Sequence, residues 1–173
     1  IECPEVFVAY CPERVLPGNI LHELIHNDRV VGGGDPLSTL HAVNFYRSFV
    51  KGKVLATDVR TAEAVKLAEN SYRDINIAYA NELSMIADRM NVDVNEVIRL
   101  ANRHPRVQIL KPGPAVGGCC IPTNPWFLAS SSPTLALLTL KAREVNMQKT
   151  DWVIQKIRAA IQERKAGLIA CLG

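Results

Sequence analysis

Residues 60–90 form a stretch of 31 residues without a single glycine or proline. Such a stretch predicts one long helix of about 45 Å, at about 1.5 Å per residue. Its apolar residues recur at broadly helical spacing and cover nearly two faces: Val65, Leu67, Ala68, Tyr72, Ile75, Ala78, Tyr79, Leu83 and Ile86. A helix with two apolar faces is typical of a bundle centre or a subunit interface. Because 173 residues build only a small bundle, we predict that this helix pairs with its copy in a homodimer.

The residues before this helix read as short strands and turns. Apolar runs predict a buried strand at 6–10 and further strands at 30–34 and 53–57, with a helix at 37–50. Strand, helix and strand in this order indicate an α/β sheet, although there are too few strands for a complete one. The glycines at 32–34 lack the strand–GxGxxG–helix context of a phosphate-binding loop, so they are weak evidence for one.

The residues after the long helix are mainly helical. Asp93 and Glu96 have the spacing of a capping box, which predicts a short helix that ends before Pro105. A longer helix is predicted from 135 to 164, and a new strand at 168–172. The predicted fold class is therefore α/β plus all-α: the last part of a sheet, then a helical domain and a long connecting helix.

Between these helices, residues 111–127 (KPGPAVGGCCIPTNPWF) contain four prolines, three glycines and two adjacent cysteines. This density of helix and strand breakers predicts a loop. Cys120 is a candidate nucleophile if its surroundings favour the thiolate. The alternative is a structural cysteine in a turn. A metal site at Cys119 and Cys120 is disfavoured, because adjacent cysteines lack the spacer of a zinc knuckle.

Composition excludes several classes of protein. A net charge of +3 suits an anionic small molecule but does not favour nucleic acid. The five cysteines, at irregular spacing, are not a disulfide framework and favour a reducing compartment, the cytoplasm. No signal peptide and no apolar run of membrane-spanning length is recognisable, so we expect no membrane association.

A few polar residues outside the loop are further candidates. Glu13 follows the first predicted strand, where parallel sheets present functional groups. Lys66 and Asn70 are four residues apart and share a face of the long helix. Cations precede the cysteine loop at Arg103, Arg106 and Lys111 and would suit phosphates. For each of them, an ordinary solvated side chain is the alternative.

Five stretches together resemble the nucleotide-sugar 6-dehydrogenases, the UDP-glucose/GDP-mannose dehydrogenase family: CPERVLPG (11–18), NDRVVGG (27–33), TAEAVKLAENSYRDINIAYANELS (61–84), NRHPRVQILKPGPAVGG (102–118) and CIPTNPWF (120–127). The chain is most similar to the branch that acts on UDP-N-acetyl-D-mannosamine. The resemblance implies the C-terminal part of a Rossmann-like NAD domain at 1–60, a helical dimerisation domain at 61–147, and a connecting helix at 148–173. That last segment also contains the first strand of a nucleotide-sugar domain.

The resemblance also assigns residues. The family's catalytic positions fall on Cys120, Lys66, Asn70, Glu13 and Asn124, and substrate-binding positions on Arg14, Val15, Arg106, Gly117 and Gly118. No metal is implied, and no residue of this chain is assigned to NAD.

The implied reaction oxidises the C6 alcohol of a UDP-sugar to a carboxylate with two NAD. Cys120 captures the intermediate aldehyde as a thiohemiacetal, a second oxidation gives a thioester, and Glu13 acts as base for its hydrolysis. Lys66 and Asn70 stabilise the oxyanion.

Three positions depart from the family pattern. Ala115 stands where the family usually has glycine, Cys119 where it has histidine or serine, and Asn124 where it has aspartate. Asn124 lacks the carboxylate that the family has at this position. An alternative to an active enzyme is therefore a non-catalytic relative that acts as a dimerisation module. UDP-N-acetyl-glucosamine and UDP-glucose are the alternative substrates.

Overall fold

The computed structural model describes residues 6–164 and 170. The strand predicted at 168–172 lies outside the described residues. The chain divides into two compact units, Ile1–Glu69 and Asn70–Gly173.

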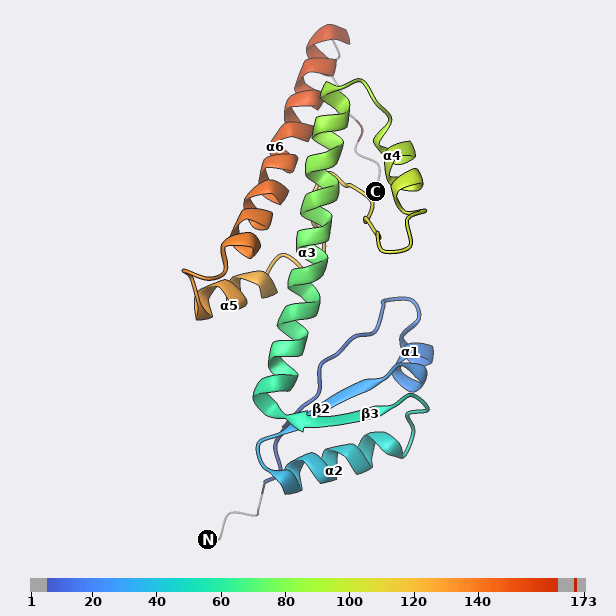
Figure 1. Ribbon diagram of the computed structural model, residues 1–173, viewed down its shortest axis with the longest axis vertical. Helices are drawn as coiled ribbons and strands as arrows, with labels where there is room; N and C mark the ends of the chain where they lie inside the picture. The colour runs from blue at the N-terminus through green and yellow to red at the C-terminus, as the bar shows by residue number, and fades with distance from the viewer. Residues whose placement is uncertain (1–5, 165–169, 171–173) are drawn as a thin grey trace. The chain divides into compact units, whose positions relative to one another are not determined.

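The first unit is a three-stranded sheet with two helices (Figure 1). Strands β2 (Arg29–Gly33) and β3 (Val54–Asp58) are parallel, with Val31 opposite Ala56, and helix α2 (Pro36–Arg47) connects them. A parallel pair joined by a helix is the βαβ unit of α/β folds. The predicted strands at 30–34 and 53–57 and the helix between them are confirmed. This unit is a partial Rossmann-like sheet.

The predicted buried strand at 6–10 is mostly wrong. Strand β1 covers only Ala9–Tyr10 and pairs antiparallel with β2, while Val6, Phe7 and Val8 are exposed. An apolar run alone does not reveal whether a partner strand extends along it. Helix α1 (Ile20–His26), which the sequence analysis did not predict, follows in the chain.

The glycines at the end of β2 are required by packing. A Cβ on Gly32 would collide with the carbonyl oxygen of Asp58 and with Ala62, and one on Gly33 would collide with Thr39. These glycines therefore let α2 and the chain after β3 approach the sheet closely.

The second unit is helical. Helix α3 (Val59–Arg89) begins in the first unit and continues into the second, which also contains α4 (Val94–Ala101), α5 (Asn124–Ser131) and α6 (Leu137–Arg164). The predicted long helix at 60–90 is thus confirmed, as are the helices predicted after it. Asp93 caps α4 by accepting a hydrogen bond from the backbone N–H of Asn95 (2.9 Å). Glu96 does not complete the capping box, because its carboxylate binds Arg99.

The loop predicted at 111–127 ends earlier than expected, because α5 begins at Asn124. Pro125 lies in the first turn of this helix. Proline is tolerated there, since the first N–H groups of a helix have no partner within it. The sequence analysis read it only as a breaker.

Helices α3 and α6 pack through a small apolar cluster of Ala78, Ala142 and Val145, with Ile75 and Met85 beside it. This chain by itself covers only part of the apolar surface predicted for α3. Tyr72, Tyr79 and Ile86 are exposed, whereas the buried positions of α3 include Asp74 and Asn81. The face of α3 that meets α6 is therefore largely polar.

Candidate functional site

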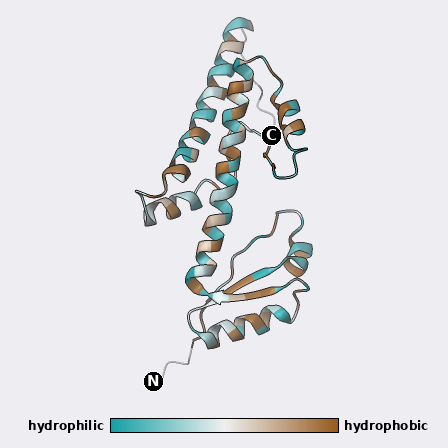
Figure 2. Cartoon of the chain, viewed as in Figure 1, coloured by the Kyte–Doolittle hydropathy of each residue, from teal (hydrophilic) through white to brown (hydrophobic). Residues whose placement is uncertain are grey.

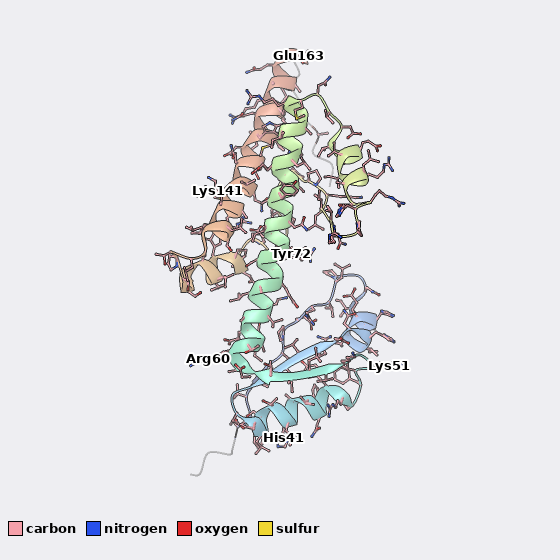
Figure 3. All side chains as sticks on the ribbon, in the orientation of Figure 1. His41, Lys51, Arg60, Tyr72, Lys141 and Glu163 are labelled. Carbon is pink, nitrogen blue, oxygen red and sulfur yellow. The ribbon has the colours of Figure 1, made fainter. Side chains whose placement is uncertain are left out.

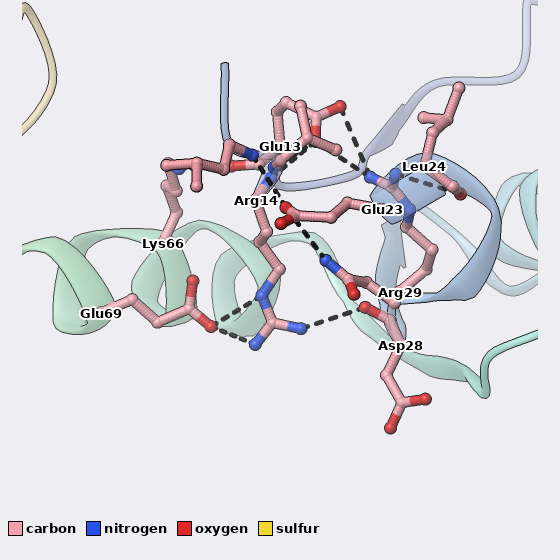
Figure 4. Close-up of polar contacts among 11 residues, drawn as sticks. Glu13, Arg14, Glu23, Leu24, Asp28, Arg29, Lys66 and Glu69 are labelled. Atoms are coloured by element: carbon pink, nitrogen blue, oxygen red, sulfur yellow. Dashed lines mark hydrogen bonds and ion pairs between the residues drawn. The ribbon is translucent and has the colours of Figure 1, made fainter. Parts of the chain in front are cut away.

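Glu13 lies at the centre of a polar cluster in the first unit (Figure 4). One carboxylate oxygen, Oε1, accepts hydrogen bonds from the backbone N–H groups of Arg14 (2.7 Å) and Val15 (2.9 Å). The guanidinium of Arg29 donates to the same oxygen at 3.2 Å. Lys66 reaches the cluster from α3 and donates from Nζ to the main-chain oxygen of Glu13. The structure thus brings together Glu13, Val15 and Lys66, which the sequence analysis had singled out.

These contacts set the charge of Glu13. Partial burial raises its pKa, but the two backbone N–H groups and Arg29 outweigh that effect and hold the pKa below its ordinary value. Glu13 is therefore an ionised carboxylate at neutral pH, with one oxygen occupied by three donors. Any base role falls mainly to its other oxygen, Oε2, which is 3.4 Å from Arg29.

Arg14 is held by an ion pair. Its Nε lies 2.8 Å from Oε1 of Glu69, its Nη2 contacts the same oxygen, and its Nη1 donates to the carbonyl oxygen of Asp28 at 3.2 Å. The hydrogen bond to Glu69 raises the pKa of Arg14 further. In this structure the predicted substrate-binding guanidinium orients the segment after β1 against α3.

The sequence analysis missed Arg29 and Glu69. Arg29 is buried, with 2% of its surface exposed, and also donates to the carbonyl oxygen of Leu24 (3.3 Å). Arg29 directly precedes the strand predicted at 30–34, which indicates no role for it, and its partner Glu13 is distant in sequence.

Asn70 lies one turn beyond Lys66 on α3 and is buried. Its Nδ2 has no hydrogen-bond partner among the described residues. Buried amide groups are nearly always paired, so an unused donor calls for an explanation, such as a ligand or a catalytic role. The role of Asn70 remains a prediction.

Three asparagines anchor the segment that leads to the cysteines, all within the second unit. Asn102 bonds both the N–H and the C=O of Ile109, at 2.8 and 2.9 Å. Asn76 bonds the carbonyl of Gln108 (2.9 Å) and the N–H of Leu110 (3.1 Å). Asn81 accepts from the N–H of Gly113 at 2.9 Å. These side chains replace the hydrogen bonds that a regular element would supply.

Asn81 is also the end of a buried polar network between α3 and α6. Its Nδ2 donates to Oδ1 of Asn146 (2.9 Å), whose Nδ2 donates to Oδ1 of Asp74 (2.8 Å). Arg143 donates to the same Asp74 oxygen at 2.7 Å. The charge of Asp74 therefore orients both amides so that Asn81 presents its oxygen to Gly113. The network links the helix pair to the start of the cysteine loop.

The cysteines themselves are exposed. Their Sγ atoms lie 3.5 Å apart, well beyond a disulfide bond of about 2.05 Å. The backbone N–H of Asn124 donates to the carbonyl oxygen of Cys120 (2.9 Å), and Thr123 Oγ1 donates to that of Cys119 (2.6 Å). Helix α5 thus begins directly on the carbonyl oxygens of the cysteine pair.

The remaining predicted residues lie on the surface of the second unit. Gly118 has φ +83°, a conformation that favours glycine, and a Cβ on Gly117 would meet only open space. Arg106 is exposed, and its backbone N–H donates to His104. Across residues 6–164 and 170, no group of three or more His, Cys, Asp and Glu side chains is arranged to hold a metal ion. Nor does that part of the chain contain a helix with the length and apolar character needed to cross a membrane.

Comparison with known proteins gives two profile matches. Residues 3–50 match the NAD binding domain of the UDP-glucose/GDP-mannose dehydrogenase family. Residues 60–148, more than half of the chain, match the central domain of the same family.

Individual relatives agree with these matches. The chain is 51% identical over 99% of its length to UDP-N-acetyl-D-mannosamine dehydrogenase of Escherichia coli K12, and spans 43% of that protein. It is 52% identical over 98% of its length to NDP-N-acetyl-D-galactosaminuronic acid dehydrogenase of Ralstonia solanacearum, and spans 40% of that protein.

A solved structure agrees as well. The UDP-N-acetyl-mannosamine dehydrogenase of Pyrococcus horikoshii superposes with a TM-score of 0.87 at 43% identity, covering 92% of this chain and 38% of the other. The chain therefore spans about two fifths of the length of the relatives it matches. On the two profile matches and these relatives, the chain belongs to the UDP-glucose/GDP-mannose dehydrogenase family.

Proposed function

We propose that the full-length protein oxidises the C6 alcohol of a UDP-N-acetyl-hexosamine to a carboxylate, with NAD as electron acceptor. The observation that carries this proposal is the 51% identity, over 99% of the chain, with a protein named UDP-N-acetyl-D-mannosamine dehydrogenase. UDP-N-acetyl-D-mannosamine is our first choice of substrate. The Ralstonia relative is named for an N-acetyl-galactosaminuronic acid, which favours the N-acetyl-hexosamine class over UDP-glucose.

Cys120 is the proposed nucleophile. A thiolate that adds to the aldehyde keeps this intermediate bound and makes it oxidisable to a thioester, which water then hydrolyses. The exposure of the Cys120 side chain supports this role. Asn124 replaces the family's aspartate, and its side-chain amide neither ionises nor takes up a proton near neutral pH, so the other groups must handle proton transfer.

Lys66 and Asn70 are the proposed oxyanion-stabilising residues, an effect often worth about 3 kcal/mol. The Nδ2 group of Asn70 has no hydrogen-bond partner among the described residues, which supports its proposed role as a donor to the oxyanion. Glu13 is the proposed base for thioester hydrolysis. Its low pKa guarantees the ionised form but makes it a weak base, so we assign it the orientation of water as well as proton removal.

This chain lacks the glycine-rich fingerprint that holds the pyrophosphate of a dinucleotide. The 173 residues contain no GxGxxG run, and the glycines that end β2 are occupied by packing against Asp58, Ala62 and Thr39. We therefore propose that NAD binding also requires parts of the full-length protein outside this chain. One molecule of NAD would accept a hydride in each of the two oxidations. We further propose that the reaction takes place in the cytoplasm, in keeping with the cysteine pattern.

The full-length protein is expected to produce NADH when supplied with NAD and UDP-N-acetyl-D-mannosamine. Two successive oxidations require two NADH for each sugar acid formed, and this stoichiometry is the decisive measurement. UDP-N-acetyl-glucosamine, UDP-N-acetyl-galactosamine and UDP-glucose, supplied separately, identify the preferred sugar. A folded full-length protein that forms no NADH with any of the four would favour the alternative of a non-catalytic dimerisation module.

We also propose that the protein is a homodimer assembled through α3. Tyr72, Tyr79 and Ile86 are 65%, 53% and 47% exposed and recur every seven residues, which places them in one stripe along the helix. Tyr72 lies near the middle of α3 (Figure 3), and apolar and polar residues are interleaved along the helix (Figure 2). A stripe of large apolar side chains on a helix favours a second helix as its cover.

Tyr79→Glu is expected to shift the protein from dimer to monomer, because it places a charge at the centre of the apolar stripe. Light scattering at micromolar concentration measures the change in mass. Arg73→Glu is the matched control, since Arg73 is exposed on the same helix but lies outside the stripe. A stable monomer in the unmodified protein, or equal loss of dimer in both variants, would rule out this interface.

A further inference from the structure

Cys119 has no part in the proposed reaction, yet it lies directly beside the proposed nucleophile. The two Sγ atoms are 3.5 Å apart and both side chains are exposed. A second thiol at this distance from a reactive cysteine is the arrangement of a resolving cysteine in redox-sensitive proteins.

We propose that Cys119 and Cys120 form a site of reversible oxidation, which closes to a disulfide between adjacent residues when the protein meets hydrogen peroxide. In the first step the sulfur of Cys120 attacks one peroxide oxygen. An S–O bond forms, the O–O bond breaks, and the leaving hydroxide takes a proton to become water.

In the second step the sulfur of Cys119 attacks the sulfenic sulfur of Cys120. The S–S bond forms, the S–O bond breaks, and the leaving hydroxide takes the proton of the Cys119 thiol to become a second water. The balance is one peroxide reduced to two waters and two thiols oxidised to one disulfide. A dithiol reductant reverses the change by thiol–disulfide exchange.

The local backbone suits this closure. Two glycines precede the pair. A Cβ added to Gly117 would meet only open space, and Gly118 has φ +83°. The backbone before the cysteines can therefore adjust as the sulfur atoms approach each other.

Adjacent Cα atoms are only about 3.8 Å apart, less than the roughly 4.4 Å at the lower end of ordinary disulfides. The resulting bond is strained, and strained, exposed disulfides are the easily reduced ones. The geometry thus favours a reversible modification over a permanent cross-link.

Cys11 is a contrasting thiol in the described part of the chain. Burial raises its pKa, although a hydrogen bond to Tyr46 and the charge of Arg29 oppose the rise. A thiol with a raised pKa reacts more slowly with peroxide, because the thiolate is the reactive form. Oxidation is therefore expected at the exposed pair before Cys11.

The test is peptide mass analysis of the full-length protein after brief treatment with hydrogen peroxide and then with an alkylating reagent. The tryptic segment 107–141 carries both cysteines and no other. We expect it to lose about 2 Da and to resist alkylation, and dithiothreitol is expected to restore both thiols. In Cys119→Ser, Cys120 lacks its resolving partner and is expected to proceed to sulfinic acid, a gain of about 32 Da that dithiothreitol does not reverse.

The proposal would be overturned if Cys120 of the protein without substitutions became sulfinic acid and no disulfide formed. It would also be overturned if dithiothreitol restored the thiol of Cys119→Ser as fully as it restores the thiols of that protein. The consequence for activity rests on the proposed function: peroxide should stop NADH formation, and dithiothreitol should restore it in the unmodified protein but not in Cys119→Ser. Absence of NADH formation before any treatment would refute the proposed function instead, while the mass measurement would still decide the redox site.

Discussion

Cys120→Ser is expected to reduce formation of the sugar acid by several orders of magnitude in the full-length protein. A serine hydroxyl is a much weaker nucleophile than a thiolate, so the thiohemiacetal and thioester are lost. The first oxidation, from alcohol to aldehyde, does not require the thiol and should remain largely possible. The measurement is acid product formed per hour, with folding checked by circular dichroism.

Cys119→Ser is the matched control, because it makes the same atomic change one residue earlier in the same exposed loop. It is expected to retain most of the activity under reducing conditions, since serine is a usual residue at this position of the family. If Cys119→Ser were inactive and Cys120→Ser active, the assignment of the nucleophile would be wrong.

The long helix and the βαβ unit were predictable from local signals. The absence of glycine and proline from 60–90 left no other element to propose, and β2 and β3 are short apolar runs separated by a helical pattern. The local signals did not reveal which other element covers each face of a helix or strand. Periodicity identified Tyr72 and Tyr79 as residues of one face, but it could not decide whether another helix of this chain or a second subunit covers that face.

In the candidate site, too, local features were predictable and contacts between distant residues were not. Glu13, Lys66 and Cys120 were candidates from their local positions, but only the resemblance joined them into one site, because their separation in sequence carries no periodic signal. The ion pair of Arg14 with Glu69 joins residues 55 positions apart, so no local pattern predicts it. The anchoring asparagines were missed for a related reason, since an asparagine on a helix is normally read as solvated.

The buried pair of Asp74 and Arg143 is the other feature with a large expected effect. Burial raises the pKa of Asp74, although Arg143 and Asn146 oppose the rise. The attraction between the two charges therefore does not fully offset the loss of water around the carboxylate. Asp74 Oδ2 and Arg143 Nε also lack hydrogen-bond partners among the described residues. The pair contributes little net stability, but each member depends on the other.

Asp74→Ala is expected to destabilise the packing of α3 against α6 by about 3–5 kcal/mol, because it leaves the buried guanidinium without a counter-charge. Arginine cannot escape this penalty by losing its proton. Hydrogen exchange of the α3 and α6 amides in the full-length protein measures the free energy of opening. Glu96→Ala is the control: it removes an exposed i,i+3 pair with Arg99, which solvent screens, so little or no loss is expected. Equal losses in the two variants would contradict the inferred role of burial.

Arg143→Met should behave differently, because the carboxylate of Asp74 can take up a proton. Without Arg143 the pKa of Asp74 in the folded protein rises further above its unfolded value of about 3.9. A raised carboxyl pKa favours the folded state below the unfolded pKa, and this advantage disappears as the pH rises through the folded pKa. The loss of stability in Arg143→Met should therefore be small near pH 4 and grow towards pH 7. The loss in Asp74→Ala should not grow over this range, because that variant lacks the titrating carboxyl group. A pH-independent loss in Arg143→Met would show that Asp74 does not become an unpaired buried charge in that variant.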